Sequence, residues 1–282
     1  MAAEGARIAV LGGRGMLGSD LVSACRLQNF DPIVLDLPEF DITNADHVQQ
    51  AVAEAEVIVN CAAYTNVDGA ESQVELAYEV NAEAVGRLGA FAREAGKWVL
   101  HISTDFVFDG CSDKPYIETD HPNPINTYGK TKLAGETLLA QSGCKYCIIR
   151  VEWTYGSAGN NFVKKLIQRA KSQETLKVVD DQIGSPTATI EAAKAICELL
   201  RKKSEGIYHF ASAGYVSRYG MAEFILDKLP MDVNLLPCKT SDFTSPATRP
   251  LNSRFDCSKI KVLLGEPIRH WQAPLEIFLR QL

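Results

Sequence analysis

RIAVLGGRGMLGSDLVSACRLQNFDPIVLD, residues 7–36, joins two short apolar runs through a glycine-rich turn and a helical pattern. Glycines 12, 13, 15 and 18 follow the first run directly, and Asp36 ends the second. In a β-α-β unit such glycines let a pyrophosphate approach the backbone, and free N–H groups at the start of the helix bind its phosphates. An acidic side chain about 20 residues later accepts hydrogen bonds from ribose hydroxyls. The segment therefore predicts a dinucleotide-binding unit rather than a turn of structural use only.

The alternation of strands and helices continues to about residue 152. Further apolar, β-branched runs stand at 57–62, 98–103 and 146–151, with helical patterns at 44–55, 69–95 and 126–141. Strands that are apolar at nearly every position are covered on both faces, and the strand–helix–strand succession produces a parallel sheet with right-handed crossovers. The pattern predicts an α/β fold with a Rossmann-type doubly wound parallel sheet.

Beyond residue 152 the pattern changes, because prolines become denser and strands sparser. We expect residues 1–152 to form the dinucleotide-binding domain and residues 153–282 to form mostly a smaller C-terminal substrate domain. Two more strands, near 176–180 (LKVVD) and 207–211 (IYHFA), are expected to rejoin the first sheet.

The composition disfavours several classes of function. The chain of 282 residues has a formal net charge of −6, which argues against nucleic acid or an acidic membrane as a partner. The apolar run at 8–11 is too short for a signal peptide and no stretch is long enough to cross a membrane, so we expect a cytoplasmic protein. The closely spaced Cys144 and Cys147 lack a second pair of metal ligands, which favours reduced, apolar cysteines.

A second motif, Tyr128-Gly-Lys-Thr-Lys132, stands at the start of the helix predicted before the fifth strand. Residues four apart share a helix face, so the Lys132 ammonium is expected to lower the pKa of Tyr128 and to bind the nicotinamide ribose. Thr104 leaves the end of the fourth strand, where ligands bind in doubly wound sheets, and is expected to orient a reacting carbonyl. His101 stands earlier on that strand and is expected to be a core histidine.

The expected cofactor is NADPH or NADH. Asp36 favours NADH because a carboxylate repels a 2′-phosphate, while Arg14 in the glycine turn can offset that repulsion. Residues after the second strand border the adenine, and residues after the third lie where the cofactor crosses the sheet edge. The predicted cofactor-binding residues are Gly12, Gly15, Met16, Leu17, Gly18, Asp36, Asp41, Ile42, Ala62, Ala63, Tyr64, Thr65, Tyr128 and Lys132.

Several longer motifs narrow the interpretation. NCAAYTNVDGAE, STDFVFDG, YGKTKLAGE, GNNF, DQIGSPT and RPLNSR occur in this order along almost the whole chain. Together they resemble the dTDP-4-dehydrorhamnose reductase family of extended short-chain dehydrogenases/reductases. The resemblance implies NAD(P)H-dependent reduction of the 4-keto group of dTDP-4-dehydro-L-rhamnose, the last step toward a cell-surface sugar precursor.

The resemblance also implies roles for individual residues. Tyr128 would donate the proton, with Lys132 as its partner and Thr104 tuning the tyrosine. Asp105 and Trp153 would contact the deoxysugar, and Asn161, Arg249 and Arg254 the nucleotide-sugar. We expect these two arginines to offset the pyrophosphate charge, with pairing to surface carboxylates such as Asp256 as the alternative.

The sequence assigns neither a metal site nor an oligomeric state. Some members of the family bind Mg²⁺ at a dimer interface through acidic residues, and Glu191 resembles one of them. The sequence offers no complete ligand set, so both Mg²⁺ and a homodimer are left open.

The sequence leaves alternative functions to be weighed. The related 4,6-dehydratases carry a Glu after Thr-Asp, where this chain has Phe106, so reduction without dehydration is favoured. The β subunit of methionine adenosyltransferase, a non-catalytic NADP-binding regulatory subunit, is similar in YGKTKL and in an RP-x-N segment. Reduction of another nucleotide-linked 4-keto-deoxysugar is the third alternative.

Overall fold

The computed structural model describes residues 5–229 and 231–282, and a parallel central sheet is its main feature. The strand order is β10–β5–β4–β3–β1–β2, and every neighbouring pair is parallel. These strands are β1 (Arg7–Leu11), β2 (Asp31–Leu35), β3 (Val57–Asn60), β4 (Trp98–Thr104), β5 (Lys145–Val151) and β10 (Gly206–Phe210). The predicted doubly wound α/β fold is confirmed. The order reverses at β1, so a crevice opens between the carboxyl ends of β1 and β3.

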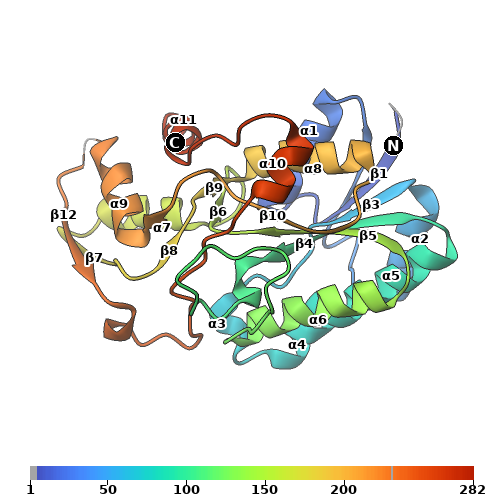
Figure 1. Cartoon of the computed structure of the whole chain (residues 1–282), viewed down its shortest axis with the longest axis horizontal. Helices are drawn as coiled ribbons and strands as arrows, with labels where there is room; N and C mark the ends of the chain where they lie inside the picture. The colour runs from blue at the N-terminus through green and yellow to red at the C-terminus, as the bar shows by residue number, and fades with distance from the viewer. Residues whose placement is uncertain (1–4, 230) are drawn as a thin grey trace.

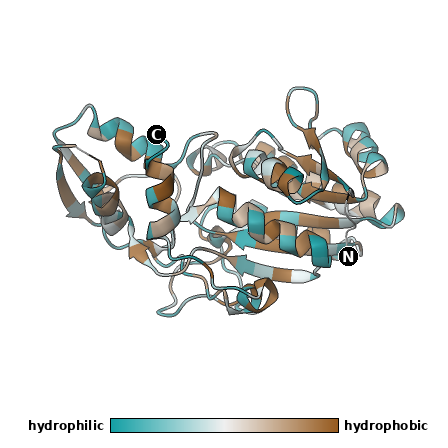
Figure 2. Ribbon diagram, turned by 90° about the horizontal axis from the view of Figure 1, so that it is seen from above, coloured by the Kyte–Doolittle hydropathy of each residue, from teal (hydrophilic) through white to brown (hydrophobic). Residues whose placement is uncertain are grey.

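Helices cover both faces of the sheet (Figure 1). On one face lie α1 (Met16–Leu27), α8 (Thr189–Lys202) and α10 (Ser258–Leu264); on the other lie α2 (Ala45–Glu54), α5 (Ala84–Glu94) and α6 (Thr127–Gln141). A separate apolar core fills each side. Figure 2 shows the central strands as mainly hydrophobic ribbons between helices of mixed polarity. The sheet is thus buried on both faces, as its nearly continuous apolar strands predict.

The helix predicted over 69–95 is divided into shorter pieces. The chain forms α3 (Val67–Ala70), α4 (Val74–Tyr78), a π-helical turn (Glu79–Glu83) and then α5. The side chain of Asn81, in the π turn, accepts a hydrogen bond from the Tyr64 N–H and donates one to the hydroxyl of Thr131 in α6. The π turn therefore ties the segment after β3 to the helix that carries Tyr128.

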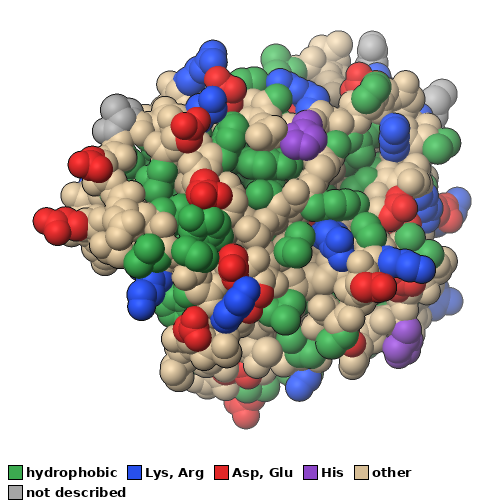
Figure 3. All heavy atoms as spheres, turned by 60° about the vertical axis from the view of Figure 1, so that its left-hand side comes forward, with side chains coloured by type: hydrophobic (Ala, Val, Ile, Leu, Met, Phe, Trp, Pro, Cys, Tyr) green, Lys and Arg blue, Asp and Glu red, His purple; other side chains and the backbone are tan. Residues whose placement is uncertain are grey.

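The C-terminal part builds a third core around α7 (Phe162–Ala170), α9 (Arg218–Asp227) and α11 (Gln272–Leu279). Its strands are β7 (Thr175–Val179) paired with β12 (Asn234–Cys238), β6 (Thr154–Tyr155) with β9 (Thr187–Ala188), and β8 (Ile183–Gly184) with β11 (Val216–Ser217). Short 3₁₀ turns span Asp105–Val107 (η2) and Thr240–Asp242 (η3). Figure 3 shows hydrophobic, basic and acidic side chains interspersed on this end of the molecule.

The expectation that LKVVD rejoins the central sheet is wrong. β7 pairs with β12 in a separate small sheet, whereas the strand at 206–210 does join the central sheet, beside β5. In β7 Leu176 and Val178 are buried against the third core and Lys177 between them is exposed. This alternation is typical of a strand with one solvated face and not of a fully covered central strand. The domain boundary at residue 152 stays a prediction.

Cys144 and Cys147 are buried free thiols. Within residues 5–229 and 231–282, no helix has both the length and the apolar character needed to cross a membrane.

Candidate active site

A cavity of about 650 Å³ lies at the carboxyl ends of the central strands. Its walls come from the glycine turn after β1, the segment after β3, the end of β4, the first turns of α6 and the segment after β5. The volume is within the usual range of ligand-binding pockets, and the position is the one at which doubly wound sheets bind their ligands.

The glycine turn forms one wall of the cavity. Gly12 has φ +73°, and a Cβ there would lie 2.7 Å from the backbone nitrogen of Ala62. Gly18 is buried in α1, where a Cβ would collide with the carbonyl oxygen of Gly12. Gly15 is the N-cap of α1 and supplies no side-chain hydrogen bond, which leaves the first N–H groups of a 12-residue helix free for an anion. This turn fits the pyrophosphate of a dinucleotide.

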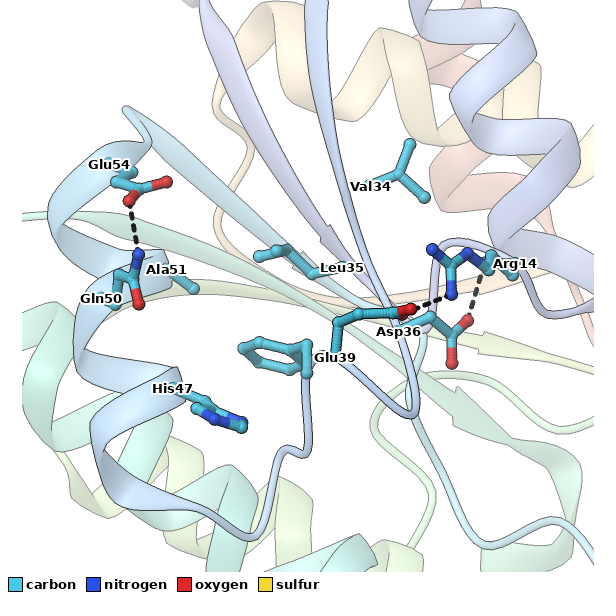
Figure 4. A pocket seen from close by; sticks show the side chains of 10 residues that line it. Arg14, Val34, Leu35, Asp36, Glu39, His47, Gln50, Ala51 and Glu54 are labelled. Carbon is cyan, nitrogen blue, oxygen red and sulfur yellow. Dashed lines mark hydrogen bonds and ion pairs between the residues drawn. The ribbon is translucent and has the colours of Figure 1, made fainter.

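Asp36 and Arg14 lie at the far end of this wall, beside a smaller pocket (Figure 4). The Asp36 carboxylate accepts the Arg14 N–H at 2.7 Å and the Leu37 N–H at 2.8 Å, which leaves further lone pairs for ribose hydroxyls. The Arg14 guanidinium instead pairs with Glu39, Nη1 to Oε2 at 2.6 Å, and this contact lowers the pKa of Glu39. Glu39 thus competes for the cation expected to balance a 2′-phosphate.

Tyr128 lies in the first turn of α6 at the cavity wall. The Asn126 side chain caps this helix by accepting the Gly129 N–H at 2.8 Å, and it donates to the carbonyl of Thr248 at 2.7 Å. Burial raises the pKa of Tyr128 and the nearby Asp105 carboxylate raises it further, while the Thr104 hydroxyl lowers it. The expected lowering of this pKa by Lys132 is therefore wrong for this structure, because burial dominates. At neutral pH Tyr128 carries its proton and can act as a proton donor.

Lys132 lies one turn further along α6 and is buried. Its Nζ donates to the carbonyl of Ile102 at 2.7 Å and lies 3.1 Å from Nε2 of His101. Burial lowers the pKa of Lys132 to about 8, against the opposing effects of Glu136 and Cys61. His101, expected to be a core histidine, is fully buried, and burial together with Lys132 holds its pKa well below the usual value.

A buried ion pair fixes α6 against the sheet. Nε and Nη2 of Arg150 in β5 donate to the two carboxylate oxygens of Glu136 at 2.9 and 2.6 Å. The hydroxyl of Ser103 donates to the same carboxylate, and Nη1 of Arg150 lies 3.3 Å from Nε2 of His209. Glu136 follows Lys132 by one helical turn, so this pair positions the helix that carries Tyr128 and Lys132.

The opposite wall of the cavity carries Asp105, Trp153 and Arg218. Trp153 has φ 45°, a left-handed conformation that is costly for a residue other than glycine, and such strain clusters at functional sites. The Arg218 guanidinium lies 3.5 Å above the Trp153 ring. Burial lowers the pKa of Arg218 to about 10, against the attraction of Asp105 and Glu152.

Two carboxyl groups in this region are buried: Asp105 belongs to the wall, and Glu152 lies outside the cavity lining. Asp105 accepts a hydrogen bond from the Ser253 hydroxyl, and burial raises its pKa to about 6. Glu152 accepts the N–H of Ser185 at 2.9 Å and that of Phe255 at 3.3 Å, and burial holds its pKa well above the usual value. The DQIGSPT and RPLNSR motifs therefore meet at Glu152 and Asp105, and these contacts give both motifs a structural role.

The cavity brings together most of the residues that the sequence nominates for the site. It is lined by Gly12, Gly15, Met16, Leu17, Asp36, Asp41, Ile42, Ala62, Ala63, Thr65, Thr104, Asp105, Tyr128, Lys132 and Trp153. Tyr64 and Gly18 are outside this lining. The backbone of Tyr64 forms hydrogen bonds with the Asn81 side chain, and Gly18 packs beneath the glycine turn.

Three residues predicted to bind the nucleotide-sugar lie outside the cavity lining. Asn161 caps α7 by accepting the Lys164 N–H at 3.1 Å and donates to the carbonyl of Gly156. Arg249 pairs with Asp68 at 2.8 Å, and Arg254 donates to the Asn252 side chain and to the carbonyl of Asp113. The alternative partner Asp256 receives neither arginine within ion-pair distance among the described residues.

Arg218 is a charged residue of the cavity lining that no sequence pattern predicted. It follows Ser217, whose hydroxyl caps α9 by accepting the Gly220 N–H at 3.0 Å. A serine before a helix predicts a helix start, but nothing in the sequence brings that start to the end of β5. Among the described lining residues, Arg218 and Lys132 are the two cations.

Glu191 forms ion pairs with Lys194 at 2.9 Å and with Arg269 at 3.5 Å. The part of the chain that the structure describes contains no group of three or more His, Cys, Asp or Glu side chains arranged to hold a metal ion. The pairing gives Glu191 a structural role, and a metal site stays unassigned.

A glycine turn at the first β-α junction and a Tyr–Lys pair on the helix before β5 together define the extended short-chain dehydrogenase/reductase class. The family model described as the RmlD substrate binding domain matches residues 6–282. The dTDP-4-dehydrorhamnose reductase of Aggregatibacter actinomycetemcomitans is 38% identical, with 96% of this chain and 97% of that protein aligned.

Two solved structures extend the comparison. The dTDP-4-dehydrorhamnose reductase of Clostridium acetobutylicum superposes with a TM-score of 0.94 at 37% identity, over 98% of this chain and 99% of that one. That of Bacillus anthracis, in complex with NADP, has a TM-score of 0.93 at 37% identity over the same shares. The chain belongs to the dTDP-4-dehydrorhamnose reductase family.

Proposed function

We propose that the protein reduces the 4-keto group of dTDP-4-dehydro-L-rhamnose to give dTDP-L-rhamnose, with NADPH or NADH as the reductant. The observation that carries the proposal is the placement of Tyr128 and Thr104 in one cavity with a glycine-lined helix start that has no side-chain cap. The free N–H groups of α1 and the available lone pairs of Asp36 fit a dinucleotide. The names of the relatives support the substrate.

When bound, the dinucleotide supplies a hydride to the carbonyl carbon of the sugar. Tyr128 then donates its phenolic proton to the oxygen, on which negative charge develops. The Thr104 hydroxyl lines the same cavity and donates to the Asp105 carboxylate at 3.1 Å; turned toward the substrate, it would stabilise the same charge. Lys132 holds the nicotinamide ribose, and the contacts of Glu136 keep its helix in place.

Arg218 takes the role that the sequence analysis assigned to Arg249 and Arg254. Its guanidinium lines the cavity, and no hydrogen bond or ion pair to this group occurs among the described residues. A guanidinium can donate two hydrogen bonds to one phosphate group, so Arg218 suits the pyrophosphate of the substrate. Trp153 offers an apolar face to the methyl-bearing sugar.

The test generates the keto-sugar in place from dTDP-glucose with a dehydratase and an epimerase, and follows NADPH absorbance. We expect oxidation that requires both upstream enzymes. Arg218→Ala is expected to raise KM by about 10- to 100-fold, because it removes charged hydrogen bonds to the substrate. Arg254→Ala is the matched control, since Arg254 lies over the Tyr215 ring but outside the cavity lining. Absence of oxidation would contradict the function and favour a binding role. An unchanged KM would contradict the placement of Arg218 alone.

Cofactor preference is expected to depend on Glu39. Glu39→Gln frees the Arg14 guanidinium for a 2′-phosphate, so the ratio of kcat/KM for NADPH to that for NADH should rise by about two- to fivefold, the scale of an exposed ion pair. Glu54→Gln is the matched control, because Glu54 lines the same pocket but is bonded to Gln50 (Figure 4). An equal change in both variants would mean that overall charge, rather than release of Arg14, decides the preference.

A further inference from the structure

The Arg218 guanidinium lies over two aromatic rings. Its central carbon, Cζ, is 3.5 Å from the centroid of the Trp153 ring and 4.9 Å from that of the Phe162 ring. Trp153 is buried after β5, and Phe162 is the half-buried first residue of α7. Phe162 also ends the GNNF motif, and the mechanism proposed above makes no use of it. These contacts give this aromatic residue a place beside the cavity.

The carboxylates that attract Arg218 are occupied by other donors. Asp105 accepts hydrogen bonds from the hydroxyl groups of Thr104 and Ser253, and Glu152 accepts two backbone N–H groups. Burial lowers the pKa of Arg218 to about 10, and Asp105 and Glu152 oppose this effect. The guanidinium is therefore charged at neutral pH, although neither carboxylate lies within ion-pair distance of it in the described part of the chain.

Stacking and hydrogen bonding use different parts of a guanidinium. The group is planar, and its N–H donors point outward in that plane. A separation of 3.5 Å is van der Waals contact, so the group lies flat on the Trp153 ring. Such a contact orients the plane and occupies none of the donors. Over residues 5–229 and 231–282, the Arg218 side chain makes no hydrogen bond, so the rings are the contacts that orient it.

The backbone of Arg218 is fixed at the same time. Its N–H donates to the carbonyl of Gln182 at 3.1 Å, and the preceding Ser217 pairs with Ile183 between β11 and β8. The long side chain thus starts from a fixed point and ends on two rings. A side chain that is ordered before its ligand arrives loses less rotamer freedom on binding, which strengthens the binding.

We propose that Phe162 is a positioning residue that, together with Trp153, holds the Arg218 guanidinium in the cavity wall with its N–H donors available to a phosphate group of the substrate. The ligand in this proposal, a nucleoside diphosphate, rests on the proposed function. The orientation of the cation rests on the geometry alone. The GNNF motif thereby acts on the substrate site through a residue of the C-terminal part.

The free protein allows a test that needs no substrate. ¹⁵N relaxation of the Arg218 Nε–H group, assigned with Arg218→Lys, is expected to show an order parameter of about 0.8 in the wild type and below about 0.6 in Phe162→Leu. Phe162→Tyr keeps the ring and should keep the order. Phe224→Leu is the matched control, because Phe224 packs in the same core against Trp271. An unchanged order parameter in Phe162→Leu, or an equal loss in Phe224→Leu, would overturn the proposal.

Binding of dTDP to the NADP-loaded protein, measured by calorimetry, tests the consequence. Phe162→Leu is expected to raise the Kd by about 3- to 10-fold, the scale of a cation–π contact, and Phe162→Tyr should restore it. In an Arg218→Ala background, Phe162→Leu should have no further effect. An equal effect in that background would overturn the proposal, because Phe162 would then act without Arg218.

The two levels of the argument fail in different ways. If the wild type binds dTDP and Phe162→Leu binds it equally well, the positioning role is overturned and the proposed function stands. If the wild type does not bind dTDP, the phosphate role is overturned together with the proposed function, whatever the order parameters show.

Discussion

Tyr128→Phe is expected to lower kcat by about 100-fold or more, the usual scale of general acid catalysis. The substitution removes the phenolic proton and keeps the ring, which packs edge-on against Phe106 at a centroid distance of 5.6 Å. Burial and Asp105 keep the Tyr128 hydroxyl protonated in the wild type, so the proton that is lost is the one available to the reacting oxygen. Stopped-flow measurement of NADPH oxidation with freshly generated keto-sugar gives the rate.

NADPH binding, measured by fluorescence titration, should change little in Tyr128→Phe. Tyr64→Phe is a suitable control, because Tyr64 lies between the lining residues Ala63 and Thr65 but is itself outside the cavity lining. A Tyr128→Phe rate within a few-fold of the wild type would remove Tyr128 from the mechanism and leave the cofactor site standing.

Arg150→Met is expected to reduce the free energy of unfolding by about 3–5 kcal/mol, because it leaves the Glu136 carboxylate buried without its cation. The side chains of Arg150 and Glu136 are only 2% and 4% exposed, so water cannot replace the lost contacts. Urea unfolding followed by far-UV circular dichroism measures the loss.

The double variant Arg150→Met/Glu136→Leu should recover much of this stability, because both charges leave together. Arg280→Met is the control for an exposed pair, since Arg280 and Glu276 are 74% and 38% exposed, and little change is expected. A single variant as stable as the wild type would show that water or a rearranged partner satisfies Glu136. If the double variant regained its stability but had a lower kcat than the wild type, the ion pair would position α6 for catalysis in addition to stabilising the fold.

Local patterns in the sequence were sufficient to predict the first β-α-β unit, the doubly wound sheet and the dinucleotide wall. Each of these depends on neighbours in the chain: the apolar runs predict covered strands, the glycines predict the turn, and Asp36 follows at the end of β2. The Tyr128–Lys132 pair could also be predicted, because residues four positions apart on a helix lie on the same face. Thr104 and Trp153 could be placed because they lie within two residues of the ends of predicted strands, and the carboxyl ends of these strands share one edge of the sheet.

The remaining features depend on contacts between distant segments. β7 pairs with β12, which begins more than 50 residues later, and no local pattern encodes that partner. Arg218 reaches the cavity because α9 starts beside the strand pair β8–β11, while Arg249 is held at Asp68. The pKa of Tyr128 is set by burial, which the spacing of Tyr128 and Lys132 does not reveal. The sequence thus carries the elements and the chemistry of the first half, and only the packing of the C-terminal part shows which of its charged side chains line the cavity.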